Sequence, residues 1–195
     1  LDPMAFVVEV PAGVERLTLQ FQHLAPISGD QGRVTMTRKL LGVQWNQTLL
    51  YPAGVAASTV SVQAELKLPD GWRAATALRD AQGRLAEPDA QGWLRFAPVS
   101  VETLVDSPLF AGRHLKRVPL DEPGTPRPVV LNLLADEAAQ LELSDAQLAA
   151  HRQLVQQADR LFGARHWRQY DFLLAQSDEF GGIGLEHHES SENEI

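Results

Sequence analysis

Apolar and polar residues alternate over several short stretches in the first two thirds of the chain. Leu17, Leu19 and Phe21 alternate with polar residues, and the stretch 60–68 keeps the same period of two. This period places apolar side chains on one face and is typical of half-buried β-strands. Further stretches of this kind, separated by glycine or proline, are residues 4–10, 33–41, 92–101 and 114–120. The pattern predicts a mainly β part built as an antiparallel sandwich or a curved sheet.

The last third of the chain has a different pattern, in which a strand, a helix and a second strand follow one another. Residues 129–136 form a largely apolar run, which is typical of a strand buried on both faces. Ser144 and Gln147 have the spacing of a capping box, apolar residues then recur at helical spacing as far as Phe162, and Gly163 follows as a stop signal. Residues 168–177 are a second strand candidate. This order predicts the beginning of an α/β unit.

The two patterns meet at a stretch with the composition of a linker. Residues 120–128, "LDEPGTPRP", contain three prolines and a glycine. The net charge of −8 also changes here, because acidic and basic residues balance over residues 1–135 and the whole excess lies in 136–195. We therefore predict two domains, an all-β domain over residues 1–122 and an α/β part over residues 123–195.

Composition narrows the classes of function. The chain has no cysteine, which excludes disulfides and thiolate metal sites and leaves both the cytoplasm and the periplasm open. A net charge of −8 argues against a nucleic-acid surface, because phosphate binding requires clustered lysine and arginine. There is no apolar run long enough for a membrane span. Nothing in the composition indicates an oligomeric state.

The end of the chain, "GGIGLEHHESSENEI", has two interpretations. Its glycines and charges are typical of a mobile acidic tail, whereas the apolar Ile183 and Leu185 between the glycines favour a strand that approaches a ligand. A helical zinc site requires histidines at positions i and i+4, and the adjacent His187 and His188 point in different directions. We therefore expect neither a metal site nor a catalytic residue within this chain.

The stretch "YDFLLAQSDEFGGIGLEHHESS", residues 170–191, resembles the segment that precedes the zinc motif in the glycyl aminopeptidase family of PDZ-containing gluzincin metallopeptidases. The stretches "LLYPAG", "LKLPDGW", "LVDSP" and "HRQLVQQADRLFG" occur in the order that this family uses, so the resemblance covers residues 40–195. The family commonly has Gly-Gly-Leu-Glu-His, and here Ile183 and Gly184 interrupt that motif. Which glycine takes which role therefore stays open.

The resemblance implies an all-β domain followed by the start of a thermolysin-like catalytic domain, which this chain leaves before the His-Glu-x-x-His motif. The parent enzyme would be a zinc aminopeptidase that removes small N-terminal residues, such as Gly or Ala, with its zinc ligands outside this chain. The chain alone would be inactive. Its part would be an edge strand that binds the peptide substrate, with Glu186 receiving the α-ammonium group. The substrate-binding residues implied in this way are Gly181, Gly182, Gly184, Leu185, Glu186 and His187.

The alternative function is a non-catalytic β-sandwich module that binds a protein partner. The two hypotheses differ over the parent sequence beyond Ile195, where only an enzyme requires a His-Glu-x-x-His motif. Under the enzyme hypothesis the last dozen residues lack their catalytic partner, and we expect them to be poorly ordered.

Overall fold

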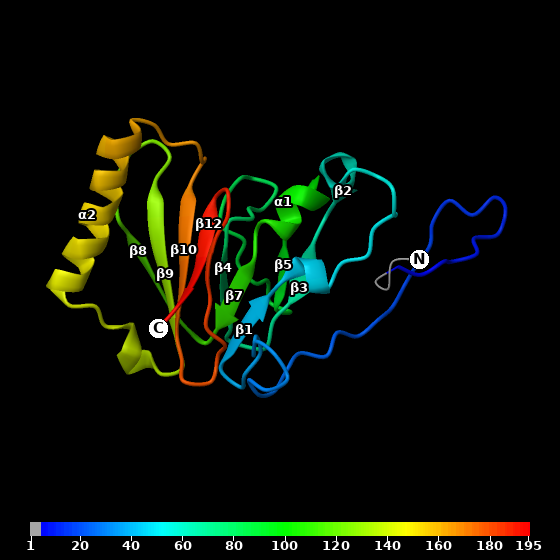
Figure 1. The fold of residues 1–195 in the computed structure, drawn as a ribbon, viewed down its shortest axis with the longest axis horizontal. Coiled ribbons are helices and arrows are strands. Elements are labelled where there is room, and N and C mark those ends of the chain that lie inside the picture. The colour runs from blue at the N-terminus through cyan, green and yellow to red at the C-terminus, as the bar shows by residue number, and fades with distance from the viewer. Residues whose placement is uncertain (1–4) are drawn as a thin grey trace.

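The structure is a computed structural model that describes residues 5–195, and it is mainly β, with antiparallel sheets and few helices (Figure 1). The first part contains a three-stranded antiparallel sheet in the order β1-β7-β4 and two paired ribbons, β2–β6 and β3–β5. Its elements are β1 (Leu40–Val43), β2 (Ser61–Val62), β3 (Glu65–Lys67), β4 (Arg73–Thr76), β5 (Trp93–Arg95), β6 (Val99–Ser100), α1 (Val101–Val105) and β7 (Leu109–Gly112). Two short 3-10 turns lie at Trp45–Gln47 and Ala57–Thr59.

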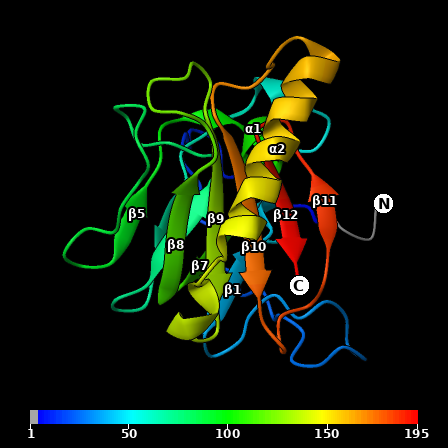
Figure 2. The ribbon, with the colours of Figure 1, turned by 90° about the vertical axis from the view of Figure 1, so that its left-hand side faces the viewer.

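The second part is a five-stranded mixed sheet in the order β11-β12-β10-β9-β8, covered on one face by the helix α2 (Figure 2). The central strands β9, β10 and β12 are parallel, and the two edge strands run antiparallel to their neighbours. The elements are β8 (His114–Pro119), β9 (Val129–Ala135), a 3-10 turn (Ala138–Leu141), α2 (Asp145–Phe162), β10 (Tyr170–Gln176), β11 (Gly184–Glu186) and β12 (Ser190–Glu194). The predicted fold class, a mainly β part followed by an α/β part, is confirmed.

Local signals explain why α2 begins and ends where it does. The Ser144 side chain accepts a hydrogen bond from the Gln147 N–H, and the Gln147 side chain bonds back to the Ser144 N–H, which completes the predicted capping box. Gly163 ends the helix with a φ of 68°, a left-handed conformation that glycine adopts without strain. Val155 is buried against the sheet, whereas Leu161 and Phe162 stay 77% and 74% exposed. The predicted apolar stripe therefore contacts the sheet only in its middle.

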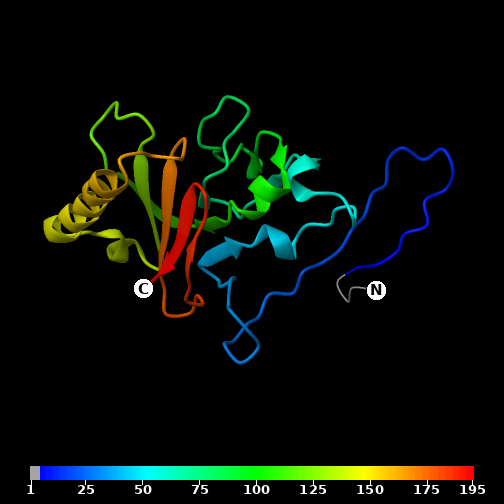
Figure 3. The same cartoon turned by 45° about the horizontal axis from the view of Figure 1, so that its top comes forward.

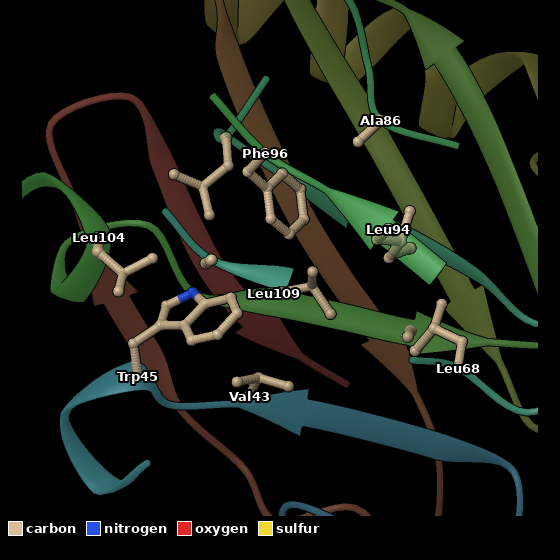
Figure 4. Close-up of a cluster of buried hydrophobic side chains, with 12 residues drawn as sticks. Val43, Trp45, Leu68, Ala86, Leu94, Phe96, Leu104 and Leu109 are labelled. Carbon is tan, nitrogen blue, oxygen red and sulfur yellow. The ribbon is translucent and has the colours of Figure 1, made fainter. Parts of the chain in front are cut away.

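The first part has its own hydrophobic core (Figure 4). Trp45, Phe96, Leu104 and Leu109 are buried there, and the Trp45 Nε1–H donates a 2.8 Å hydrogen bond to the Ser107 carbonyl. A second core lies between α2 and the mixed sheet, and a third joins the two parts through Phe110, Leu134 and Phe180 among others. Each large apolar side chain buried in this way contributes about 1.5–3 kcal/mol.

Residues 5–24 contradict the prediction of strands at the start of the chain. No strand lies within these residues, and their apolar side chains are largely exposed on an excursion away from the body (Figure 3). Residue 4 of the first predicted strand lies outside the described residues. A period of two shows only that a segment could be half-buried in a sheet, and no partner strand lies beside this one.

The C-terminal end contradicts the prediction of poor order. Residues 190–194 form β12, which is an internal strand between β10 and β11, and Ser190, Ser191 and Glu192 are buried. The expectation was wrong because β12 finds its partners within this chain, pairing in parallel with β10.

The proline-rich stretch 120–128 connects β8 to β9, and these strands are antiparallel neighbours in the mixed sheet. The predicted division between residues 122 and 123 thus falls in a loop that joins two strands of one sheet. Within residues 5–195, no helix combines the length and the apolar character needed to cross a membrane.

Candidate functional site

β11 is an edge strand, paired with β12 on one side only. The His187 N–H donates a 2.9 Å hydrogen bond to the Ser190 carbonyl, so His188 and Glu189 form the two-residue turn of a hairpin. Hydrogen-bonded pairs alternate along an antiparallel ladder, and the next such pair is Leu185 with Glu192. The backbone N–H and C=O groups of Gly184 and Glu186 therefore face the open edge, where they can pair with another extended chain.

Asp106, at the C-terminal end of α1, holds the hairpin turn from the first part of the chain. Its Oδ2 accepts a 2.9 Å hydrogen bond from the His188 backbone N–H and lies 3.1 Å from the His188 Nδ1. Its Oδ1 lies 3.3 Å from the Nδ1 of His187, whose side chain is 9% exposed. One carboxylate thus contacts two consecutive residues that directly follow Glu186.

Residues that follow α2 hold the same turn from the other side. The Arg168 guanidinium pairs with the Glu189 carboxylate, with 2.6 Å between Nη2 and Oε2, and the Arg168 backbone N–H donates to the same carboxylate. Burial raises the pKa of Glu189, but the hydrogen bonds from Arg168 outweigh this effect and the net pKa is lowered. His166 Nε2 lies 2.9 Å from the His188 carbonyl.

Glu186 lies beside a largely apolar groove of about 280 Å³ between α2 and the mixed sheet. Trp167 and Tyr170 pack edge to face with ring centroids 5.1 Å apart, and Phe172 continues the row at the same distance from Tyr170. Burial raises the pKa of the Tyr170 hydroxyl; its bond with Ser191 opposes this rise and the charge of Glu186 adds to it. Tyr170 therefore stays a neutral phenol, and Glu186 is the only carboxylate among the residues that line the groove.

The glycines implied by the resemblance lie in different places. Gly181 contacts the N-terminal part: its N–H donates a 2.6 Å bond to the Val34 carbonyl, and its own carbonyl accepts a 2.9 Å bond from the Arg33 Nε–H. A Cβ on Gly182 would come 3.0 Å from the Glu194 carboxylate. A Cβ on Gly184 would meet nothing within 4 Å. The structure therefore brings Gly184, Leu185, Glu186 and His187 together along the edge strand and its turn, and places Gly181 away from that open edge.

The neighbouring strand β12 is anchored by a network that sequence reasoning missed. The Glu192 carboxylate is fully buried, pairs with Arg33 at 3.2 Å between Nη1 and Oε2, and accepts a hydrogen bond from the Gln44 side chain. Asp106 was also missed as a functional residue, although it lies in the recognised "LVDSP" stretch. No periodic pattern links residues this far apart in sequence, so only the tertiary structure reveals these contacts.

Residues 1–113 match the Peptidase M61 N-terminal domain, and the chain therefore belongs to this family. Its fold is similar to a solved structure of an aminopeptidase N family protein from Idiomarina loihiensis, with a TM-score of 0.60 and 20% sequence identity over 80% of this chain. The matched region is 25% of that protein's length. An M1 zinc metallopeptidase from Deinococcus radiodurans matches more distantly, with a TM-score of 0.42 and 16% identity over 69% of this chain and 29% of its own. No curated protein matches the sequence.

Proposed function

We propose that this chain is the N-terminal part of a zinc-dependent metallo-aminopeptidase and supplies the strand that binds the peptide substrate. Membership in the Peptidase M61 N-terminal domain family supports a peptidase parent. By the resemblance of residues 170–191, the parent is a PDZ-containing gluzincin of the glycyl aminopeptidase type that removes small residues such as Gly and Ala.

The observation that carries the proposal is the open edge of β11, which ends in the carboxylate of Glu186. An extended peptide can add to such an edge through main-chain hydrogen bonds, here to the outward-facing groups of Gly184 and Glu186. Glu186 then receives the α-ammonium group of the peptide, which restricts binding to peptides with a free N-terminus. The open space at Gly184 allows the substrate backbone to lie close to the strand.

Zinc would be held by residues of the parent outside this chain. Over residues 5–195, no three His, Asp or Glu side chains are grouped so as to hold a metal ion. When bound, zinc would polarise the scissile carbonyl and activate a water molecule. The residues of this chain bind the peptide, align it along β11 and fix its amino terminus at Glu186.

We also propose where the all-β domain ends. The predicted division at residues 122 and 123 separates β8 from the sheet in which it pairs with β9. The family match ends at residue 113, directly before β8 begins at His114. Both observations favour a boundary before β8, with β8 as the first strand of the catalytic part.

The test is the substitution Glu186→Ala in the parent enzyme. Loss of one partner of a desolvated ion pair costs about 2–5 kcal/mol, so kcat/KM for free-amine peptides should fall roughly 30-fold to several thousand-fold. An N-acetylated peptide has no ammonium group, and its slow turnover should not change. Zinc content should also stay the same, because Glu186 is not a ligand in this proposal.

Two further variants control this test. Glu179→Ala removes an exposed carboxylate outside the edge strand and should leave kcat/KM unchanged. If Glu189→Ala instead abolishes selectivity for the free amine, the motif is displaced by three residues. If neither Glu186→Ala nor Glu189→Ala alters turnover of free-amine peptides, the proposed role of this strand is wrong.

A further inference from the structure

We propose that Asp106 is a positioning residue for the amine-binding end of β11. This inference rests on the proposed function of Glu186 and adds to it a residue from the first part of the chain. Asp106 belongs to the region that matches the family, whereas Glu186 lies in the mixed sheet, 80 positions further along the chain.

The contacts of Asp106 restrain the turn at both of its oxygens. Oδ2 accepts the His188 N–H at 2.9 Å and lies 3.1 Å from the His188 Nδ1, while Oδ1 lies 3.3 Å from the His187 Nδ1. Hydrogen bonds to a charged acceptor are about twice as strong as neutral ones. Because His187 directly follows Glu186, restraining this turn also restrains the backbone from which the Glu186 carboxylate projects.

The support on which Asp106 lies is itself well held. Asp106 ends α1, where its N–H donates a 3.1 Å bond to the Glu102 carbonyl. Leu104 is buried in the core of the first part, and the Ser107 carbonyl accepts the Trp45 Nε1–H at 2.8 Å. The carboxylate is therefore attached to a packed core rather than to a free loop.

β11, by contrast, has little support of its own. It is three residues long, all three are exposed, and its only strand partner is β12. Binding groups have to be held to within about 0.5 Å of the productive geometry, and a displacement of about 1 Å can cost 10²-fold in rate. A residue that ties the end of this strand to the core should therefore control how well Glu186 meets an amine.

The first experiment measures amide hydrogen exchange in the 195-residue chain. Asp106→Ala should accelerate exchange of the His188 amide at least about tenfold, because a hydrogen bond to a charged group is lost. Asp106→Asn keeps an acceptor for this N–H and should retain most of the protection. Asp178→Asn, which alters an exposed aspartate before Phe180, is the matched control and should change nothing at His188. Equal exchange in all three variants would overturn the inference.

The second experiment measures kinetics in the parent enzyme. Asp106→Ala should lower kcat/KM for free-amine peptides by about 10–100-fold and leave turnover of the N-acetylated peptide unchanged, with partial rescue in Asp106→Asn. A purely structural role would lower both substrates together. If Glu186→Ala lowers free-amine turnover and Asp106→Ala does not, the inference fails alone. If Glu186→Ala has no effect, the proposed function and the inference fail together.

Discussion

The guanidinium of Arg33 lies against the fully buried carboxylate of Glu192, with 3.2 Å between Nη1 and Oε2. The same side chain donates from Nε to the Gly181 carbonyl at 2.9 Å. A carboxylate removed from water is stable only when it is paired and hydrogen-bonded. Arg33 therefore fastens the segment before β1 to both the glycine loop and the strand that supports the proposed binding edge.

We expect Arg33→Ala to destabilise the fold by about 3–5 kcal/mol, because it leaves the Glu192 charge buried without its partner. Urea unfolding of the 195-residue chain measures this difference. Arg38→Ala removes an exposed arginine and should stay within about 0.5 kcal/mol of the original chain. The double variant Arg33→Ala, Glu192→Gln should lose much less than the two single losses combined. Strict additivity would show that the two groups do not interact.

Gly181→Ala and Gly184→Ala form a matched pair that separates a structural glycine from one at the open edge. A Cβ at Gly181 would lie 2.8 Å from the Val34 backbone nitrogen, whereas a Cβ at Gly184 meets nothing within 4 Å. We expect Gly181→Ala to cost about 1–3 kcal/mol and Gly184→Ala to stay within about 0.5 kcal/mol, as measured by urea unfolding. In the parent enzyme, Gly184→Ala should still slow peptide turnover. Equal stability losses in the two variants would contradict the assignment.

The stability contribution of Asp121 should depend on pH. Its carboxylate pairs with Arg165 at 2.7 and 2.8 Å and accepts the Val129 N–H at 2.7 Å. The hydrogen bonds from Arg165, with a smaller effect from Val129, hold the pKa of Asp121 below its ordinary value of 3.8 against the opposing effect of burial. A lowered folded-state pKa stabilises the fold above the unfolded value, and this stabilisation is lost as the pH falls through the folded value.

Asp121→Asn should therefore cost about 1–3 kcal/mol at pH 7, and the difference from the original chain should shrink as the pH is lowered below about 4. Urea unfolding at pH 7 and at pH 3 measures both differences. Asp178→Asn should show no difference at either pH, since this carboxylate is exposed. A loss at pH 3 as large as that at pH 7 would contradict the role of the charge.

The 195-residue chain by itself should bind no stoichiometric zinc and hydrolyse no peptide. His187 and His188 both direct Nδ1 toward Asp106, and their adjacency does not give the ligand spacing of a helical zinc site. Metal analysis after dialysis against a zinc-free buffer measures this. One zinc retained per chain would show that a metal site had been overlooked.

The sequence by itself determined the elements whose signals are local. Ser144, Gln147 and Gly163 mark the ends of α2 because capping bonds and a left-handed residue act within one helical turn. The apolar run of β9 likewise predicted a strand covered on both faces, and its residues are almost all buried. The resemblance of residues 170–191 also drew attention to the stretch that forms β11.

Only the tertiary structure decided which strands find partners. Residues 5–24 alternate as a strand does and remain unpaired, whereas the polar run at 190–194 becomes an internal strand. A buried Glu192 is stable because Arg33 and Gln44, distant in sequence, meet it in space. Asp106 meets His187 and His188 in the same way. Strand pairing and charge burial depend on contacts between distant segments, and such contacts leave no periodic pattern along the chain.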